Sequence, residues 1–514
     1  METKRTEKVI LSFVFGVIEK IIILLLPFLV RTILIKKLGI EYAGISGLFT
    51  SILTFLNVAD LGFSSATMFC LYRPVAEDDE EEICSLAKFL KIVYLAVSGV
   101  IALVGIAFTP FLKYFINGTL PEGINIYVVF LIYVFNSSSS YCFAAYRVPI
   151  LEAHQENYVV SMIRTIAEIV KSIGQIVILL ISPNYYIFAL FLPLSTLLIN
   201  FLLTMYFRKK MSWCVPKGNV SKETKKVLRN KMFFLMLHKI ASAITNSVDN
   251  IVISSFIGLA LVGIYGNYSL VTSALMGVVL VFYNSLKPAV ANQIIKSKEN
   301  SIDVYKSLLF VSLLMCSFIS VCLCSLFQPF IFIWLGETYL LSSTAVLLIV
   351  MFFFFNATRQ FFSSIYIDIF GLWDKTIVVQ LISALLNLVL DIALGKFYGI
   401  EGIVFASFAS TGFVSLPFDI WLVSKMLCKK KKDLILHSIF EYFLFLAVCF
   451  ISIGVIQRLL SFNVFKSLTG FTIDCLVTAF SSFVLLCMPI CLYKKEASHV
   501  FMHLRRFLKR GRNK

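Results

Sequence analysis

The sequence predicts an all-α membrane protein with about fourteen transmembrane helices, arranged as two six-helix lobes followed by two C-terminal helices. The first supporting observation is composition. The chain has 514 residues, of which 59% are hydrophobic and 15% charged, and its mean hydropathy is +0.89. A soluble domain carries about 25% charged residues. The other two observations are an internal repeat and the spacing of the apolar stretches.

The repeat joins two segments that share a pattern of glycines. At a constant offset of 219 positions, the two copies contain Gly39, Gly44, Gly47 and Gly258, Gly263, Gly266. Further along, Asn136 matches Asn356 at an offset of 220. Six expected spans separate the copies, and an even number gives both copies the same orientation. Such repeats are typical of transporters whose binding site lies between two lobes.

About 20 apolar residues are enough to cross a bilayer once as a helix. Stretches of this kind occur fourteen times, centred near Leu24, Leu56, Ser98, Val134, Gly174, Phe191, Ser242, Gly277, Cys316, Phe353, Leu386, Ser410, Val448 and Val484. We expect an N-terminal lobe over residues 1–230, a C-terminal lobe over residues 231–427, and two additional spans with a basic tail over residues 428–514. A strongly basic loop over residues 208–231 marks the boundary between the lobes.

Most of the 46 Lys and Arg residues fall in loops on one side of the predicted spans. Basic loops concentrate on the cytoplasmic side, so both termini are expected there. The net charge of +17 suits contact with anionic membrane lipids. We expect no nucleic-acid partner, because the basic residues flank spans and form no separate basic domain. The predicted external loops are short and leave little room for a catalytic apparatus.

Ionisable residues inside predicted spans are candidates for function, because a charge in hydrocarbon is costly unless it is paired or faces water. The first span contains Glu19, Lys20 and Arg31. Glu19 and Lys20 are adjacent, so they do not share a helix face, and at least one should reach water or another helix. The alternatives are a pair that anchors neighbouring helices and, for Arg31, a side chain that extends to the membrane surface.

Other predicted spans also contain acidic residues. Glu168 and Lys171 are three positions apart on one helix, which favours a structural ion pair. Asp249, Asp391 and Asp419 lie in the second lobe. Carboxylates within a membrane can bind a proton or a cation. Glu19, Asp249 and Asp391 are therefore candidates for ion coupling.

Polar clusters occur at matching places in both lobes. The fourth span contains Asn136 to Ser140, an Asn followed by four serines, and the tenth contains Asn356, Thr358, Arg359 and Gln360. Such clusters suit a shared hydrophilic cavity, and the alternative is hydrogen bonding between helices. Arg147 and Arg359 lie toward the predicted cytoplasmic ends of these spans. Their guanidinium groups offer the paired donors that suit a phosphate.

The sequence lacks the motifs of several enzyme classes. It contains no GxxxxGK[ST], HExxH or GxSxG sequence, which argues against nucleotide hydrolysis and against zinc or serine hydrolases. The twelve cysteines show no CxxC spacing, and we interpret them as small buried apolar residues. We therefore expect neither a catalytic residue nor a cofactor nor a metal site.

The N-terminal motifs resemble those of a known family. They are Leu38-Gly39-Ile40-Glu41-Tyr42-Ala43-Gly44-Ile45-Ser46-Gly47-Leu48-Phe49, Ala59-Asp60-Leu61-Gly62 and Leu71-Tyr72-Arg73-Pro74-Val75-Ala76-Glu77. Together they closely resemble the opening of bacterial polysaccharide flippases, which belong to the multidrug/oligosaccharidyl-lipid/polysaccharide exporter superfamily. These family members often carry Glu where Asp60 stands, and we add Asp60 to the ion-coupling candidates.

The resemblance implies a fold related to multidrug extruders and lipid II flippases. It also implies transport of undecaprenyl-pyrophosphate-linked oligosaccharides to the outer leaflet of the bacterial cytoplasmic membrane, for capsule, O-antigen or a related surface polymer. Glycosyltransferases and a polysaccharide polymerase are the implied partners. By position, Arg31 resembles the first-span arginine of the cationic cavity in these flippases.

Two alternatives remain at this point. The first is an ion-coupled multidrug or metabolite antiporter with the same fold, which Glu19, Asp249 and Asp391 would serve. The second is a membrane glycosyltransferase or polymerase, for which the acidic run from Glu77 to Glu82 is the nearest candidate motif. For the flippase, we expect Arg31, Lys20, Arg147 and Arg359 to bind the diphosphate. Asn136, Ser140, Asn356 and Gln360 are expected to contact the sugars.

Overall fold

The computed structural model describes residues 2–57, 63–118, 120–121, 123–296, 301–427, 431–460 and 468–492. Within these ranges the regular secondary structure is helical and includes no strand, which confirms the predicted all-α class. The chain divides into two compact units, Met1–Gly266 and Asn267–Lys514.

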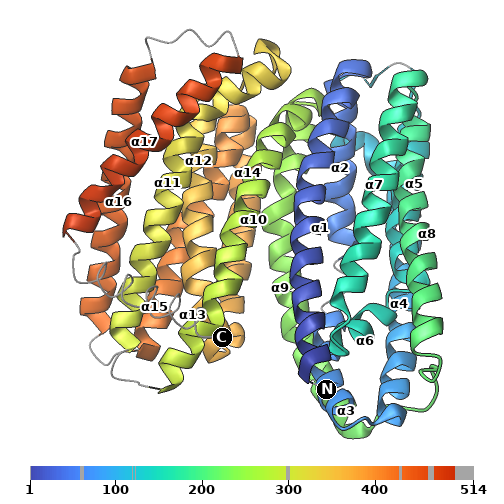
Figure 1. The fold of residues 1–514 in the computed structure, drawn as a ribbon. Helices are drawn as coiled ribbons and strands as arrows, with labels where there is room; N and C mark the ends of the chain where they lie inside the picture. Colours follow the sequence, from blue (N-terminus) through green and yellow to red (C-terminus); the bar gives the residue numbers. More distant parts are fainter. Residues whose placement is uncertain are drawn as a thin grey trace. The chain divides into compact units, whose positions relative to one another are not determined.

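Unit 1 is built from long helices that run side by side, with the short α6 between them near one end (Figure 1). A 3₁₀ helix, η2, covers Thr109–Phe115. The α-helices that begin in this unit are α1 (Glu2–Lys37), α2 (Ile40–Leu56), α3 (Phe63–Ala76), α4 (Glu80–Phe108), α5 (Ile126–Cys142), α6 (Arg147–Ala153), α7 (Asn157–Ile181), α8 (Tyr185–Lys210), α9 (Lys222–Phe256) and α10 (Leu259–Lys296).

Unit 2 contains the rest of α10 and seven further α-helices. They are α11 (Ser301–Leu335), α12 (Ser343–Thr358), α13 (Ser364–Phe370), α14 (Trp373–Ala409), α15 (Leu416–Leu427), α16 (Lys431–Leu460) and α17 (Leu468–Leu492). A 3₁₀ turn, η3, covers Glu337–Tyr339, and two π-helical turns, η4 (Arg359–Ser363) and η5 (Ser410–Ser415), lie within longer helical segments. The π turns matter because they often occur at functional sites.

The chain is a multi-pass membrane protein. Among the described residues, eight helical segments are long and apolar enough to cross a membrane, or nine if the bent pair α5 and α6 counts as one span. One of the eight, Trp373–Leu427, breaks at Gly399, whose φ of 60° lies outside the helical region. Each of the fourteen centres expected from the sequence lies within a helical segment, so the predicted count is roughly consistent with the structure.

Polar side chains define where several helices begin. Asp79 accepts a hydrogen bond from the backbone N–H of Glu82 at 3.0 Å and so caps α4. Capping satisfies backbone donors that the first helical turn leaves unpaired. The same role is taken at α5, α8, α9 and α12 by Asn125, Asn184, Ser221 and Ser342.

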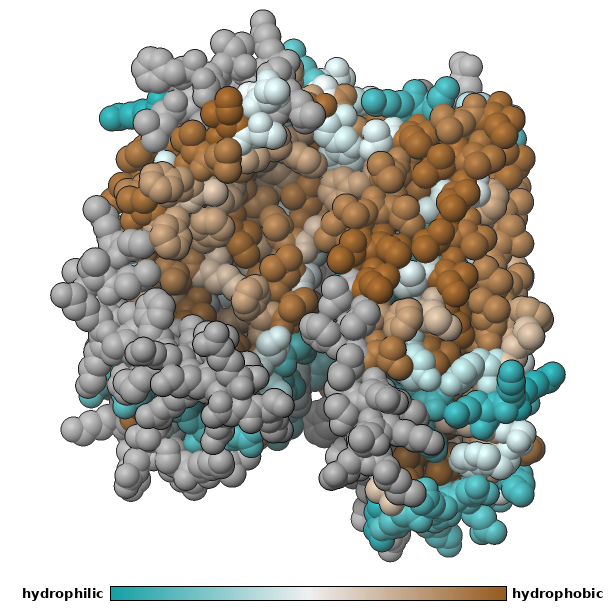
Figure 2. All heavy atoms as spheres, viewed as in Figure 1, coloured by the Kyte–Doolittle hydropathy of each residue, from teal (hydrophilic) through white to brown (hydrophobic). Residues whose placement is uncertain are grey.

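In unit 1, α1 packs along α7, and α5 packs against both α4 and α8. Hydrophobic residues cover much of the face of this unit that Figure 2 shows, as expected for a surface in contact with lipid. Lipid is itself apolar, so close packing and hydrogen bonds rather than apolar burial must hold such helices together. In unit 2, α11 packs against α12, α16 and α17.

The boundary between the units falls within α10, between Gly266 and Asn267. The sequence instead predicts the lobe boundary after residue 230, within the basic loop over residues 208–231. The two criteria measure different things: α9 and the start of α10 belong to the second copy of the repeat, but α9 packs on α2 and α3. The repeat-based division into lobes stays a prediction.

Candidate functional site

Arg147 lies at a bend in the chain of unit 1. The axes of α5 and α6 differ by 49°, and Arg147 is the first residue of α6. Its Nη1 donates a hydrogen bond to Thr204 Oγ1 on α8. The guanidinium carbon lies 4.9 Å from the ring centre of Tyr146 and 5.6 Å from that of Phe207. Aromatic rings therefore hold a cation in place without neutralising its charge.

The charge of Arg147 has no carboxylate partner among the residues that the structure describes. Its Nε is buried and makes no hydrogen bond there. A buried donor without a partner is costly, so an anion at this position would be stabilised. Cys214 lies in the loop that follows α8. Burial raises the pKa of its thiol to about 12; the neighbouring Cys84 thiol raises this pKa further, and the charge of Arg147 lowers it.

Arg359 has a different environment in unit 2. Its Nε lies 2.7 Å from Oδ2 of Asp419, and the two side chains are 17% and 2% exposed. The pair sits where the π turn η4 begins. Asn356 and Gln360 lie on either side of Arg359 along the chain, both half-buried. Within the described ranges their side-chain amides make no hydrogen bond.

Arg31 is tied to the start of α10. Its Nη2 donates to the backbone oxygen of Gly263 at 2.8 Å, and the guanidinium lies against Gly266. In the same helix, Glu19 is 9% exposed and Lys20 is exposed. The two adjacent side chains thus differ in environment, as expected of neighbours on a helix.

The first three side chains of the polar run in α5, those of Asn136, Ser137 and Ser138, bond outside the helix, whereas the hydroxyls of Ser139 and Ser140 donate within it. Asn136 Oδ1 accepts a hydrogen bond from Thr196 on α8 at 2.7 Å. Ser138 and Ser98 on α4 approach to 2.9 Å between their hydroxyl oxygens, and Ser137 donates to Asn57. These contacts fit the interhelical alternative for those residues. Ser140 is exposed and donates only to the carbonyl of Ser137, one turn earlier.

The acidic candidates lie in separate environments. Asp391 is 0% exposed, and its Oδ1 accepts a hydrogen bond from Asn387 Nδ2 at 3.3 Å. Asp249 is 7% exposed and accepts from the Tyr265 hydroxyl at 2.9 Å. Asp60 lies outside the described residues.

Two further pairs of polar side chains each lie within a single helix. The ion pair predicted between Lys171 and Glu168 is confirmed at 2.7 Å. The sequence reasoning missed His437 and Glu441 on α16, whose Nε2 and Oε1 lie 3.2 Å apart with the carboxylate side chain 0% exposed. Their spacing of four residues within an apolar stretch was the available signal.

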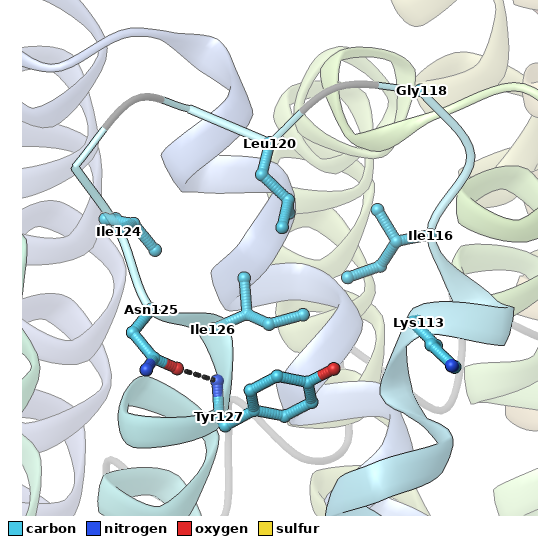
Figure 3. A pocket seen from close by; sticks show the side chains of 8 residues that line it. All are labelled: Lys113, Ile116, Gly118, Leu120, Ile124, Asn125, Ile126 and Tyr127. Atoms are coloured by element: carbon cyan, nitrogen blue, oxygen red, sulfur yellow. Dashed lines mark hydrogen bonds between the residues drawn. The ribbon is translucent and has the colours of Figure 1, made fainter.

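A hollow of about 410 Å³ opens beside the loop that follows η2 (Figure 3). Lys113 and Tyr127 lie at its edge, and its wall includes Ile116, Leu120 and Ile126. It contains none of the predicted substrate-binding residues. Across the described ranges, no group of three or more His, Cys, Asp or Glu side chains could hold a metal ion.

The fold is shared with known membrane transporters. A structure of the lipid II flippase MurJ in an inward closed conformation matches with a TM-score of 0.66 and 16% identity, covering 94% of this chain and 99% of that one. An inward-facing multidrug resistance MATE family transporter of the MOP superfamily matches with a TM-score of 0.62 and 13% identity, covering 79% and 96%.

A third match is a mutant of the Vibrio cholerae MATE transporter VcmN, with a TM-score of 0.56, 15% identity and coverage of 84% and 100%. At these identities the likeness shows the fold alone. None of the curated proteins is similar enough in sequence to match the chain. The sequence pattern of one family, described as polysaccharide biosynthesis protein, matches residues 10–292, which is more than half of the chain. The chain therefore belongs to the polysaccharide biosynthesis protein family.

Proposed function

We propose that this protein moves oligosaccharide repeat units linked to undecaprenyl pyrophosphate from the inner to the outer leaflet of the cytoplasmic membrane. The mechanism is alternating access, and the repeat units are destined for capsule, O-antigen or another surface polysaccharide. Family membership and a fold shared with a flippase support this assignment. Glycosyltransferases would build the repeat unit before transport, and a polymerase would join the units afterwards.

Arg147 is the observation that carries the proposal. A diphosphate in a membrane protein needs a cation that is sheltered from water and not already neutralised. Arg147 meets both conditions, because its half-buried guanidinium is flanked by two aromatic rings and has no carboxylate partner in the described ranges. Its buried Nε is a further donor, and paired donors suit a phosphate. On the predicted orientation, Arg147 lies toward the cytoplasmic side, where the headgroup enters.

The other predicted residues take secondary roles. Lys20, Arg31 and Arg359 are further cations for the diphosphate as it moves, and Arg359 would exchange Asp419 for a phosphate oxygen. Asn356 and Gln360 offer amides to sugar hydroxyls. In unit 1, Asn136 offers an amide and Ser140 a hydroxyl. The lipid tail stays within the bilayer throughout.

Ion coupling is a second element of the proposal. Asp391 is fully buried, with Asn387 beside it and Ser407 bonded to the same amide at 3.1 Å. A buried carboxylate beside polar groups can take up a proton or a cation. Glu19, Asp60 and Asp249 are further candidates. The same feature supports the competing function, an ion-coupled multidrug or metabolite antiporter.

The test uses the purified protein in lipid vesicles with a fluorescent undecaprenyl-pyrophosphate oligosaccharide, read by accessibility to a reagent outside. We expect Arg147→Ala to slow leaflet exchange at least tenfold. Arg147→Lys should be intermediate, because Lys keeps the charge and loses the fork of donors. The matched control is Arg208→Ala, which removes an exposed arginine from the last turn of α8.

Unchanged exchange with Arg147→Ala, at equal protein content, would contradict the role of this residue. Drug efflux in the same vesicles, without movement of the lipid-linked glycan, would favour the antiporter instead.

A further inference from the structure

The two copies of the repeated segment each form a sharp corner between helices. Gly39 lies between α1 and α2, and Gly258 lies between α9 and α10. Their φ angles are 116° and 133°. Residues with a Cβ rarely adopt this backbone conformation, whereas glycine does so readily. The first helical residues after the corners are Ile40 and Leu259, which are counterparts in the repeat.

The helices that leave these corners meet backbone to backbone. A Cβ on Gly44 would lie 2.0 Å from the carbonyl oxygen of Leu259, and a Cβ on Gly263 would lie 2.4 Å from the carbonyl oxygen of Ile40. Gly44 and Gly263 are counterparts too, so the contact is reciprocal. No side chain fits at either position. We call Gly44, Leu259, Gly263 and Ile40 the glycine seam.

Hydrogen bonds from matching positions flank the seam. Arg31 Nη2 donates to the carbonyl of Gly263 at 2.8 Å, and Asn250 Nδ2 donates to Ser51 Oγ on α2 at 3.0 Å. Arg31 and Asn250 are also separated by 219 positions in the sequence. Each copy of the repeat therefore reaches across to the other copy from the same place.

The α2 side of the seam is anchored within unit 1. The Tyr185 hydroxyl donates to the backbone oxygen of Tyr42 at 3.1 Å and lies 2.7 Å from Ser46 Oγ. Tyr133 donates to Ser46 at 3.0 Å. These bonds fix the first turns of α2 to α5 and α8. Separation of the seam therefore means that the start of α10 moves relative to α2, while α2 stays bonded to α5 and α8.

We propose that the glycine seam is a latch, closed in this structure, that separates and re-forms during transport. Small residues let helix backbones approach closely in membranes, where packing and weak C–H···O contacts favour association. The two backbones are packed so closely that not even a methyl group fits between them. We therefore expect this contact to be either fully formed or broken, as a switch between two states requires. The inference rests on the proposed transport function only in the second experiment below.

The first experiment measures opening directly in the purified full-length protein. Val262, 1% exposed and 3.2 Å from where a Cβ of Gly47 would lie, is replaced by Cys as a reporter. The rate of its reaction with a maleimide is then measured, with the unsubstituted protein as background. Adding Gly44→Ala or Gly263→Ala should raise this rate at least tenfold. Gly99→Ala is the control, because a Cβ there meets nothing within 4 Å.

An equal rate in Gly44→Ala and Gly99→Ala, with both proteins monodisperse and equally heat-stable, would overturn the latch. Gly47→Ala gives a graded check, because its neighbour is a Val262 side-chain atom and not backbone. For this variant the reporter is Ala43→Cys, because Ala43 is 1% exposed. Gly47→Ala should raise the rate of the maleimide reaction by less than Gly44→Ala does.

The second experiment locks the seam and needs no alanine variant to fold. Gly47→Cys combined with Val262→Cys places a sulphur near a Cβ at a distance that suits a disulfide. Oxidation should reduce the rate at which the double variant transports the lipid-linked glycan at least tenfold, and a reductant should restore this rate. Each single variant should transport at the same rate with oxidant as with reductant. Unchanged transport by the fully cross-linked protein would overturn the latch. Absence of transport in the reduced protein would count against the proposed function, and the maleimide rates alone would then decide the latch.

Discussion

At the scale of single residues, neutralisation distinguishes the arginines. Arg359 is neutralised by Asp419, which is 2% exposed, whereas Arg147 is held by aromatic rings and a hydroxyl. A buried ion pair loses much of its Coulomb energy to desolvation, but removing one partner leaves the other charge buried without its counter-charge. The Arg359 pair should therefore matter for stability, and Arg147 for binding.

We expect Arg359→Ala to lower the free energy of unfolding by about 3–5 kcal/mol, because the buried Asp419 carboxylate loses this cation. The double variant Arg359→Met with Asp419→Leu should recover most of this loss. Chemical unfolding in detergent micelles measures both. Arg73→Ala is the control, because its pair with Glu77 has side chains 84% and 55% exposed, and solvent screening leaves such a pair little effect on stability. Equal losses at Arg73 and Arg359 would contradict this assignment.

At the scale of helices, glycines set how closely neighbours pack. Gly174 on α7 faces Phe191 on α8, and a Cβ there would lie 2.1 Å from the ring atom Cε1. Gly99 on α4 faces open space. Replacing Gly by Ala should thus have opposite effects on stability at the two positions. Where nothing obstructs the methyl group, Ala stabilises a helix relative to Gly by about 1 kcal/mol.

Gly174→Ala should destabilise the protein by about 1–3 kcal/mol through overpacking, while Gly99→Ala should be neutral or slightly stabilising. Thermal unfolding of the purified variants provides the measurement. Adding Phe191→Leu to Gly174→Ala should recover part of the loss, since the smaller side chain leaves room for the methyl group. The explanation fails if Phe191→Leu brings no recovery.

At the scale of the whole molecule, charge distribution predicts orientation. The net charge of +17 arises mainly from loops that the positive-inside rule assigns to the cytoplasm. The end of unit 1 that carries the basic last turn of α8 should therefore face the cytoplasm, and η2 should face outside. The proposed direction of transport depends on this assignment.

Cysteine labelling in intact cells tests the orientation. Tyr114, 70% exposed in η2, and Ser212, exposed after α8, are replaced by Cys one at a time. A membrane-impermeant maleimide should label Tyr114→Cys before permeabilisation and Ser212→Cys only afterwards, with the unsubstituted protein as background. The reverse order would place the termini outside and invert the proposed direction.

The sequence alone predicted much of the fold and less of the site. Apolar run lengths locate helices because hydrocarbon forces each span to satisfy its own backbone hydrogen bonds, so all fourteen expected centres fall in helical segments. The Glu168–Lys171 pair was predictable because both residues share one helix face. The pairing of Arg359 with Asp419, 60 residues away, was not, since periodicity does not encode which helices become neighbours.

Composition and repeats are properties of the chain, so they were enough to identify a polytopic helical membrane protein with a duplicated glycine pattern. The role of that pattern became visible only with the packed helices, in which Gly44 and Gly263 lie against the carbonyls of Leu259 and Ile40. The packing likewise sets which polar residues of α5 bond to other helices, namely Asn136, Ser137 and Ser138, and it leaves the charge of Arg147 unneutralised within the described part of the chain. These outcomes depend on which faces pack together, and packing is settled only when all helices are in place.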